Sequence, residues 1–137
     1  MLSVDKAALI EIYTDGACIG NPGSGGWAAI IIEDGTQREV HGREAYTTNN
    51  RMEIMAVING LSSVPESADV MIVSDSTYVV NTMTRNWKRK ANIDLWERLD
   101  KETAKRNVKW RWVRGHAGHP MNEKADSLAN QEARYGV

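Results

Sequence analysis

The spacing of apolar and polar positions changes along the chain and predicts two kinds of element. Segments in which the two alternate, or in which several apolar residues run together, are predicted as strands. These strands cover residues 9–14, 27–32, 36–45, 70–73 and 108–112. The third is mostly polar, which predicts an edge strand. The glycine-rich stretch Gly16 to Gly26 is predicted as a long turn, and Asp34-Gly35 as a hairpin turn.

Apolar residues that recur every three or four positions predict helices, most clearly at Ile54, Val57, Ile58 and Leu61. Asp94, three residues before Glu97, has the spacing of a capping box. Pro120 suits the first turn of a final helix. The predicted helices cover residues 50–61, 76–84, 94–106 and the segment that begins at 120. Three strands followed by helices that alternate with two more strands favour an α/β fold with a mixed sheet.

Length and composition indicate one globular domain over residues 1–137. No run approaches the roughly 18 apolar residues of a membrane span, and residues 1–8 lack a signal-peptide pattern. A single cysteine, Cys18, excludes an internal disulfide and favours the reducing cytoplasm. The start at Met1 and the end at Val137 favour a stand-alone protein. The net charge of −1 gives no general attraction for polyanions, so a nucleic-acid partner would need a local basic patch or metal.

Four acidic residues stand near the ends of predicted elements: Asp15, Glu53, Asp75 and Asp126. If the first and fourth strands are parallel neighbours, Asp15 and Asp75 meet at one edge of the sheet. Carboxylates gathered in this way repel one another unless cations neutralise them. Oxygen ligands select Mg²⁺, Mn²⁺ or Ca²⁺ over Zn²⁺. Two such ions, about 3.5–4 Å apart, can support displacement at a phosphodiester.

Each acid also has a plain structural interpretation. Asp15 could be a turn residue before Gly16, and Asp75 could cap the following helix. Glu53 could cap a helix together with Asn50, and Asp126 could be a solvated helix residue. The flanking residues decide between the two interpretations.

Those residues form six motifs spread over nearly the whole chain: YTDGA at 13–17, GNPG at 20–23, TTNNRME at 47–53, SDS at 74–76, WVRGHAGHP at 112–120 and NEKAD at 122–126. In this order they make the chain resemble type 1 ribonuclease H, the family of endonucleases that cut the RNA strand of RNA/DNA hybrids. The resemblance implies a ribonuclease H-like α/β fold. Its five-stranded mixed sheet has three antiparallel strands, then two parallel ones, with helices on both faces.

The resemblance also implies the site. Asp15, Glu53, Asp75 and Asp126 would hold two Mg²⁺ ions, which Mn²⁺ could replace, and products would carry 5′-phosphate and 3′-hydroxyl ends. His116 would assist proton transfer or product release, on a loop made mobile by Gly115 and Gly118.

Further residues match positions that contact the hybrid in this family: Asn21, Thr48, Asn49, Asn50, Trp87, Lys88 and Asn92. Amides suit a 2′-hydroxyl, which both donates and accepts hydrogen bonds, although turn and cap chemistry would use the same residues. The implied partner is the hybrid alone, bound by a monomer.

Relatives often carry a long basic handle before the Asp94-Leu95-Trp96 segment, and here only Arg85, Lys88, Arg89 and Lys90 remain. Weaker binding of the DNA strand is therefore expected. Neutralising the last three together is predicted to raise KM and to flatten its salt dependence, unless the run is merely solvated.

Two substitutions accompany the shortening. Met83 or a neighbour stands where relatives often place a stacking tryptophan, and Tyr46 stands where they place an arginine of a phosphate pocket.

Three other functions compete with hybrid cleavage: a hybrid-binding module without catalysis, a nuclease of the same fold that cuts DNA, and a structural calcium site. The complete set of four carboxylates argues against the first, the asparagines against the second, and the scatter of the acids over several elements against the third.

Overall fold

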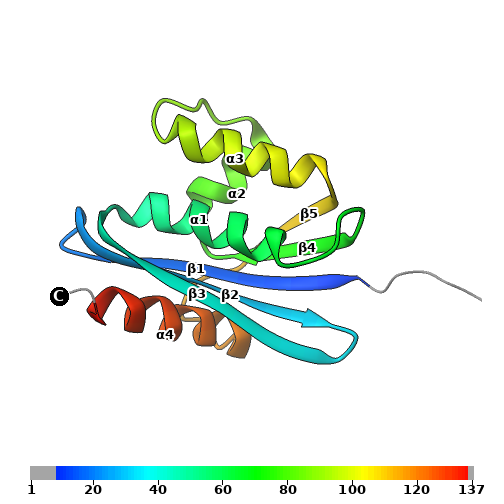
Figure 1. Ribbon diagram of the computed structural model, residues 1–137, viewed down its shortest axis with the longest axis horizontal. Helices are drawn as coiled ribbons and strands as arrows, with labels where there is room; N and C mark the ends of the chain where they lie inside the picture. Colours follow the sequence, from blue (N-terminus) through cyan, green and yellow to red (C-terminus); the bar gives the residue numbers. More distant parts are fainter. Residues whose placement is uncertain (1–8, 136–137) are drawn as a thin grey trace, which may run out of the picture.

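The computed structural model describes residues 9–135, in which one five-stranded sheet carries helices on both faces (Figure 1). The strand order is β3-β2-β1-β4-β5, with β1, β2 and β3 antiparallel and β1, β4 and β5 parallel. This confirms the predicted fold class, including the edge position of the polar strand. The strands are β1 (Ile10–Ile19), β2 (Gly23–Glu33), β3 (Thr36–Thr47), β4 (Asp69–Ser74) and β5 (Asn107–Trp112). The segment predicted to lack a signal peptide, residues 1–8, lies outside the described part.

Three helices cover one face of the sheet: α1 (Asn49–Ser62), α2 (Thr77–Arg85) and α3 (Ile93–Ala104). The main core lies beneath them, where Ile12 and Ile72 of the sheet meet Leu61 and Leu99 of the helices. The fourth helix, α4 (Pro120–Tyr135), covers the opposite face and packs through small residues such as Ala129. Among the described residues, no helix is long and apolar enough to cross a membrane.

The long turn predicted over residues 16–26 is wrong, because β1 continues to Ile19 and β2 begins at Gly23. Its glycines lie mostly within strands, where other segments approach too closely for a side chain. A Cβ atom on Gly25 would lie 2.3 Å from the Thr47 methyl carbon, and one on Gly26 would lie 2.2 Å from the backbone oxygen of Ala129. The turn itself is only residues 20–22.

The predicted capping box at Asp94 is also wrong. Helix α3 begins at Ile93, after Asn92, which adopts a left-handed conformation with φ 60°. The Asp94 carboxylate instead accepts hydrogen bonds of 3.0 and 2.8 Å from the guanidinium of Arg51 in α1. This bond lowers the pKa of Asp94 to about 2. Asp94 therefore ties the start of α3 to the start of α1.

Candidate active site

Asp15 and Asp75 lie side by side at one edge of the parallel pair. Strands β1 and β4 are in register up to Thr14 and Ser74, so the two acids directly follow the last paired residues. The sequence predicted Asp15 at the end of the first strand. In the structure Asp15 lies within β1, because β1 continues along β2 after β4 has stopped. The turn and cap interpretations fall away, since Asp15 is a strand residue and Ser76 is the N-cap of α2.

Glu53 comes to the same point from α1, which crosses β1 at Gly16. A Cβ atom on Gly16 would lie only 2.5 Å from the backbone nitrogen of Glu53, so glycine allows this close crossing. The N-cap of α1 is Thr48, whose hydroxyl accepts a 3.2 Å hydrogen bond from the Arg51 N–H. Glu53 lies a turn further into the helix, which excludes the capping interpretation. Carboxylate oxygens of Asp15, Glu53 and Asp75 lie within 4.8 Å of one another.

Asp126 reaches the cluster from α4 on the opposite face of the sheet. It lies outside the 4.8 Å group of three, yet its charge contributes to raised pKa values at Asp15 and Asp75. One of its oxygens accepts a 3.1 Å hydrogen bond from the Asn130 amide, so it is not simply a solvated helix residue. The Ser24 hydroxyl donates a 2.6 Å bond to the Ala133 carbonyl and thereby holds α4 on β2.

The electrostatics of the cluster are unfavourable without a cation. Burial, then the charge of Asp75, raises the pKa of Asp15 to about 8. Burial, then the charge of Asp15, raises the pKa of Glu53 well above its usual range. Burial, then Asp126, raises that of Asp75. In residues 9–135, one buried oxygen of Asp15 and one of Glu53 accept no hydrogen bond. Oxygens that are buried, crowded and unpartnered fit divalent-cation ligands.

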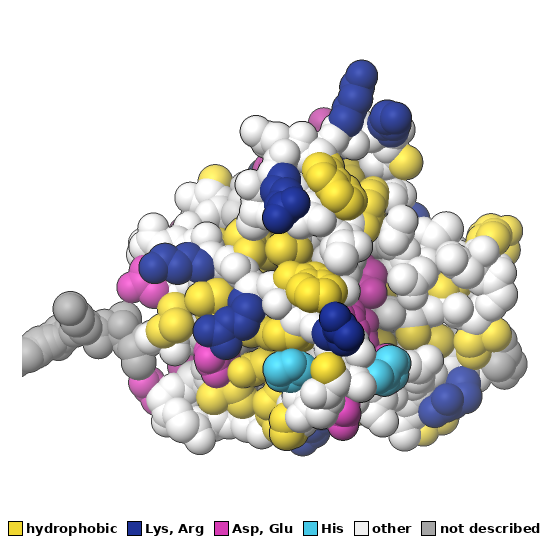
Figure 2. All heavy atoms as spheres, turned by 180° about the vertical axis from the view of Figure 1, so that it is seen from behind, with side chains coloured by type: hydrophobic (Ala, Val, Ile, Leu, Met, Phe, Trp, Pro, Cys, Tyr) yellow, Lys and Arg dark blue, Asp and Glu magenta, His cyan; other side chains and the backbone are white. Residues whose placement is uncertain are grey.

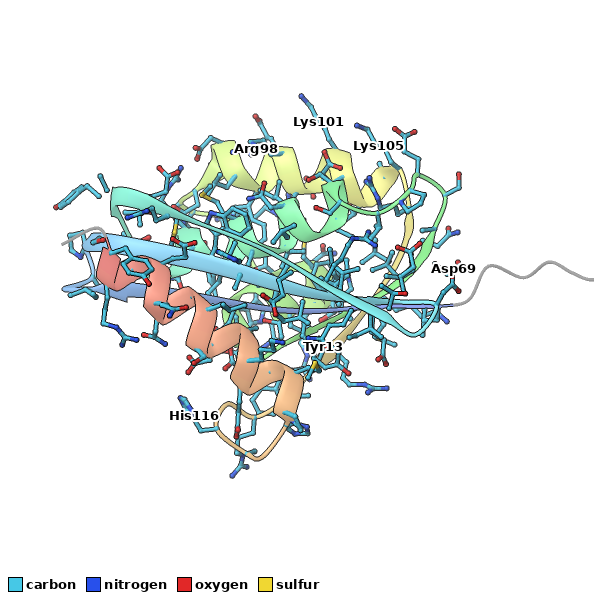
Figure 3. The ribbon with its side chains drawn as sticks, turned by 60° about the horizontal axis from the view of Figure 1, so that its bottom comes forward. Tyr13, Asp69, Arg98, Lys101, Lys105 and His116 are labelled. Atoms are coloured by element: carbon cyan, nitrogen blue, oxygen red, sulfur yellow. The ribbon has the colours of Figure 1, made fainter. Side chains whose placement is uncertain are left out.

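The loop before α4 closes one side of the cluster. His116 is exposed on this loop with φ 55°, and its charge lowers the pKa of Asp75 (Figure 3). A Cβ atom on Gly115 would lie 2.7 Å from Oδ2 of Asp75. Glycine at position 115 therefore allows the loop backbone to approach Asp75 closely, and the mobility expected of this loop stays a prediction. Of the two glycines, Gly118 has a positive φ, 82°, which favours glycine, and Gly115 does not.

The predicted hybrid-contact residues form two groups. In the first group, Oδ1 of Asn21 accepts a 2.9 Å hydrogen bond from the Asn49 N–H, which joins the β1–β2 turn to the start of α1. Thr48 and Asn50 flank Asn49 at this helix start, and Asn50 is exposed. The first group therefore gathers at the start of α1, the helix that carries Glu53.

The second group lies around α3 and the loop before it. The side-chain oxygen of Asn92, Oδ1, accepts a 3.3 Å hydrogen bond from the Arg51 guanidinium. The side-chain nitrogen of Asn92 donates a 3.1 Å hydrogen bond to the Tyr78 hydroxyl. Trp87 and Lys88 are exposed in the loop between α2 and α3. On the face shown in Figure 2, acidic side chains lie near the middle, with histidines just below, and Lys and Arg side chains project at the top.

Three residues that support these groups were not predicted as site residues. Arg51 links α1 to α3 through Asp94, and Tyr78 accepts from both Asn92 and the Trp96 indole. The indole of Trp112 donates a 3.0 Å bond to the backbone oxygen of Asp75. Trp112 ends β5, the strand next to β4. Its position at the end of a predicted strand was the feature of the sequence that could have placed it near Asp75. The bonds of Arg51 and Tyr78 join elements that the sequence does not place together.

Comparisons with known proteins agree on one family. The model of the RNase H family matches residues 7–134. A ribonuclease H of Pseudomonas fluorescens is 49% identical over an alignment that covers 89% of this chain and 90% of that protein. A ribonuclease H of Bartonella bacilliformis is 48% identical over an alignment that covers 96% of this chain and 92% of that protein.

Two solved structures are similar over most of the chain. LC9-RNase H1, described as a type 1 RNase H with the type 2 active-site motif, has a TM-score of 0.82 and 33% identity and covers 98% of this chain and 76% of its own. LC11-RNase H1, solved in complex with an RNA/DNA hybrid, has a TM-score of 0.78 and 25% identity, with coverage of 92% and 97%.

Proposed function

Because the chain belongs to the ribonuclease H family, we propose that its carboxylate cluster is the catalytic centre of an endonuclease that hydrolyses the RNA strand of RNA/DNA hybrids. The observation that carries the proposal is the convergence of Asp15, Glu53 and Asp75 within 4.8 Å, with one buried oxygen of Asp15 and one of Glu53 that no group in residues 9–135 satisfies. A purely structural role gives no reason to bury like charges in this way.

Asp15, Glu53, Asp75 and Asp126 would hold two divalent ions. These would be Mg²⁺, which Mn²⁺ could replace. When bound, such ions neutralise the carboxylates, stabilise charge on phosphoryl oxygens and make water a stronger nucleophile. Asp15 would contact both ions, as the resemblance to the family implies. Glu53 and Asp75 would serve the side of the attacking water, and Asp126 the side of the leaving group. Cleavage would leave 5′-phosphate and 3′-hydroxyl ends.

The remaining residues act on the substrate and its protons. His116, which is exposed and whose charge acts on Asp75, would carry a proton at the cluster or help the product leave. Asn21, Thr48, Asn49 and Asn50 would contact the minor groove, where an amide can both donate to and accept from a 2′-hydroxyl. The bond between Asn21 and the Asn49 N–H fixes the β1–β2 turn on the helix that carries Glu53, so binding and cleavage share one frame.

Trp87, Lys88 and Asn92 would meet the other strand of the hybrid. Asn92 is held in place by Arg51 and Tyr78. The enzyme would act as a cytoplasmic monomer, consistent with its single cysteine.

One experiment tests the proposal directly. End-labelled RNA/DNA hybrid, duplex RNA and duplex DNA are each incubated with Mg²⁺, with Mn²⁺ and with chelator. We expect cleavage of the hybrid only, within the RNA strand and only with metal. Binding of the hybrid in chelator without cleavage in metal would favour a binding module, and cleavage of duplex DNA with the hybrid intact would favour a DNA nuclease.

A further inference from the structure

Residues 86–92 connect α2 to α3 and carry the basic run that the sequence places there. Asn86 and Asn92, at the two ends, both have left-handed backbone conformations with φ 55° and 60°, so each end makes a sharp turn. The residues between them belong to no helix or strand. A connection of this kind is fixed only by what its side chains contact.

Asn92 holds one end of the connection through its bonds to Arg51 and Tyr78, and within residues 87–91 the side-chain hydrogen bonds are those of Arg89. The Arg89 guanidinium donates to both carboxylate oxygens of Asp100 in α3, at 2.5 and 3.0 Å. Its central carbon lies 5.2 Å from the ring centre of Trp96, which is 1% exposed, and one nitrogen lies 3.5 Å from the sulfur of Met83. A bidentate ion pair and an aromatic face together leave little of the guanidinium free for another ligand.

The neighbours of Arg89 differ in this respect. Trp87, Lys88 and Lys90 are exposed, and neither lysine forms an ion pair within residues 9–135. The basic run is therefore not one uniform surface. Arg89 points back onto α3, while the lysines on either side of it remain available to solvent or to a polyanion.

We propose that Arg89 is a positioning residue: clamped to Asp100 and Trp96, it fixes the α2–α3 loop so that Trp87 and Lys88 meet the hybrid without first having to be ordered. The proposal rests on the proposed function and revises one expectation from the sequence, in which Arg89 contributed positive charge to the hybrid. A loop that is ordered before binding loses less conformational entropy on binding, which raises affinity although the bound complex is the same.

The two roles for Arg89 predict opposite effects at Asp100. If Arg89 contacts phosphate, removing the negative charge of Asp100 frees the guanidinium and leaves hybrid binding unchanged or tighter. If Arg89 is a clamp, removing that charge releases the loop and weakens binding, even though the protein becomes more positive.

The experiment compares Arg89→Gln, Asp100→Asn, the double variant and Lys88→Gln. Glu97→Gln, an exposed residue of the same helix, is the charge-matched control for Asp100→Asn. The Kd for a hybrid is measured in chelator over a range of salt, and KM and kcat are measured with Mg²⁺. We expect Arg89→Gln and Asp100→Asn each to weaken binding by about 3- to 10-fold.

The double variant should be no weaker than either single variant, because the same clamp is removed in all three. The change should fall on KM rather than on kcat, and Glu97→Gln should bind as tightly as the wild type or slightly more tightly. Lys88→Gln should lower the slope of log K against log salt by about 0.9, the value expected when the protein neutralises one phosphate fewer. Wild-type or tighter binding by Asp100→Asn, beside weaker binding by Arg89→Gln, overturns the clamp.

Hydrogen exchange separates the failure of this proposal from the failure of the proposed function. In the free protein, amides of residues 87–91 should exchange faster in Arg89→Gln and Asp100→Asn, while Leu95 and Leu99 in α3 stay protected. Unchanged exchange in the loop refutes the clamp even in an active enzyme. If the wild type neither binds nor cleaves the hybrid, the proposed function fails, and exchange still tests the clamp.

If either single variant loosens α3 as well, a variant in which the two charged residues trade places tests the clamp instead. Arg89→Asp combined with Asp100→Arg restores the opposite charges at the same sites. Recovery of loop protection and of hybrid affinity supports the clamp, and lack of recovery refutes it.

Discussion

The carboxylate cluster and the α2–α3 loop, which we propose to contact the same substrate, satisfy their charges in opposite ways. The cluster gathers like charges in a buried place, and oxygens of Asp15 and Glu53 have no hydrogen-bond partner among the described residues. In the loop, Arg89 is paired with Asp100 and covered by Trp96. The difference teaches that the proposed catalytic cluster is held by the core at a cost in stability, whereas the proposed binding loop is held by its own ion pair.

The sharpest way to break the comparison is to remove charge from the cluster. Asp15→Asn should lower hybrid cleavage by on the order of 10³-fold or more, at least the loss known for a single electrostatic donor. The same change should stabilise the metal-free fold at neutral pH, since the Asp15 carboxyl has to take up a proton when the chain folds and asparagine does not. Activity assays and urea unfolding in chelator measure the two effects. Loss of activity together with loss of stability would contradict this view of Asp15.

A pH titration of stability tests the same unfavourable charge without a mutation. Because the folded-state pKa of Asp15 is raised to about 8, the folded protein retains a proton there that the unfolded chain loses near pH 4. The free energy of unfolding of metal-free protein should therefore fall as pH rises from about 4 to about 8. The slope should approach about 1.4 kcal/mol per pH unit for one proton.

Urea unfolding in chelator across this pH range measures the slope. Asp15→Asn is the control and should flatten it, and Mg²⁺ added at pH 8 should restore stability by binding the folded state. Stability that rises steadily over the range would contradict the expectation.

Crowding at the edge of the cluster predicts an intermediate effect. Gly115→Ala places a methyl group against the Asp75 carboxylate and should lower kcat by about 10- to 100-fold, since small displacements of reacting groups have effects of this size. Gly118→Ala in the same loop is the matched control, because its Cβ would meet no atom within 4 Å and only its backbone is strained. Equal losses in both variants would indicate a general effect of the loop.

His116 shares a property with each of the two regions. It is exposed, like the α2–α3 loop, and it lies beside the carboxylate cluster. His116→Ala should slow turnover by about tenfold without abolishing it. A fully engaged acid–base group contributes about 10²–10⁴-fold, and a mobile exposed side chain contributes less. Single-turnover rates would locate the loss in chemistry or in product release. A wild-type rate would leave His116 without a part in either.

The smallest effect is expected at the exposed lysines of the loop. Lys88→Gln with Lys90→Gln should raise KM by about 3- to 10-fold and flatten its salt dependence by about 0.9 for each phosphate that is no longer neutralised. Lys101→Gln with Lys105→Gln, on the outer side of α3, is a control of equal charge (Figure 3). The same KM change in both pairs would mean that only net charge matters.

Much of the fold was predictable because each element carries its own period. The alternation around Ile12 and the apolar run before Asp75 predicted two strands whose neighbouring ends bring the acids together, as observed. The motifs then placed Glu53 and Asp126 at the same point, although α4 arrives from the opposite face of the sheet.

What could not be predicted depends on contacts between distant segments. The glycines of β1 and β2 resemble a turn in sequence, and only the approach of α1 and α4 shows why they lie in strands. Asp94 has the spacing of a cap, but Arg51, 43 residues away, takes its carboxylate. The inward direction of Arg89 follows from Asp100 and Trp96, and no local pattern distinguishes it from Lys88.

Glycines in β1 and β2 allow helices to cross these strands closely, and this limits how the thermal stability of the enzyme can be increased. Replacing glycine by alanine often stabilises proteins, because it restricts the unfolded chain. Here Gly16 and Gly26 touch the backbones of α1 and α4, so an added methyl group would push a helix away from the sheet. Efforts to engineer heat resistance should therefore leave these crossings alone and turn to side chains on the outer surface.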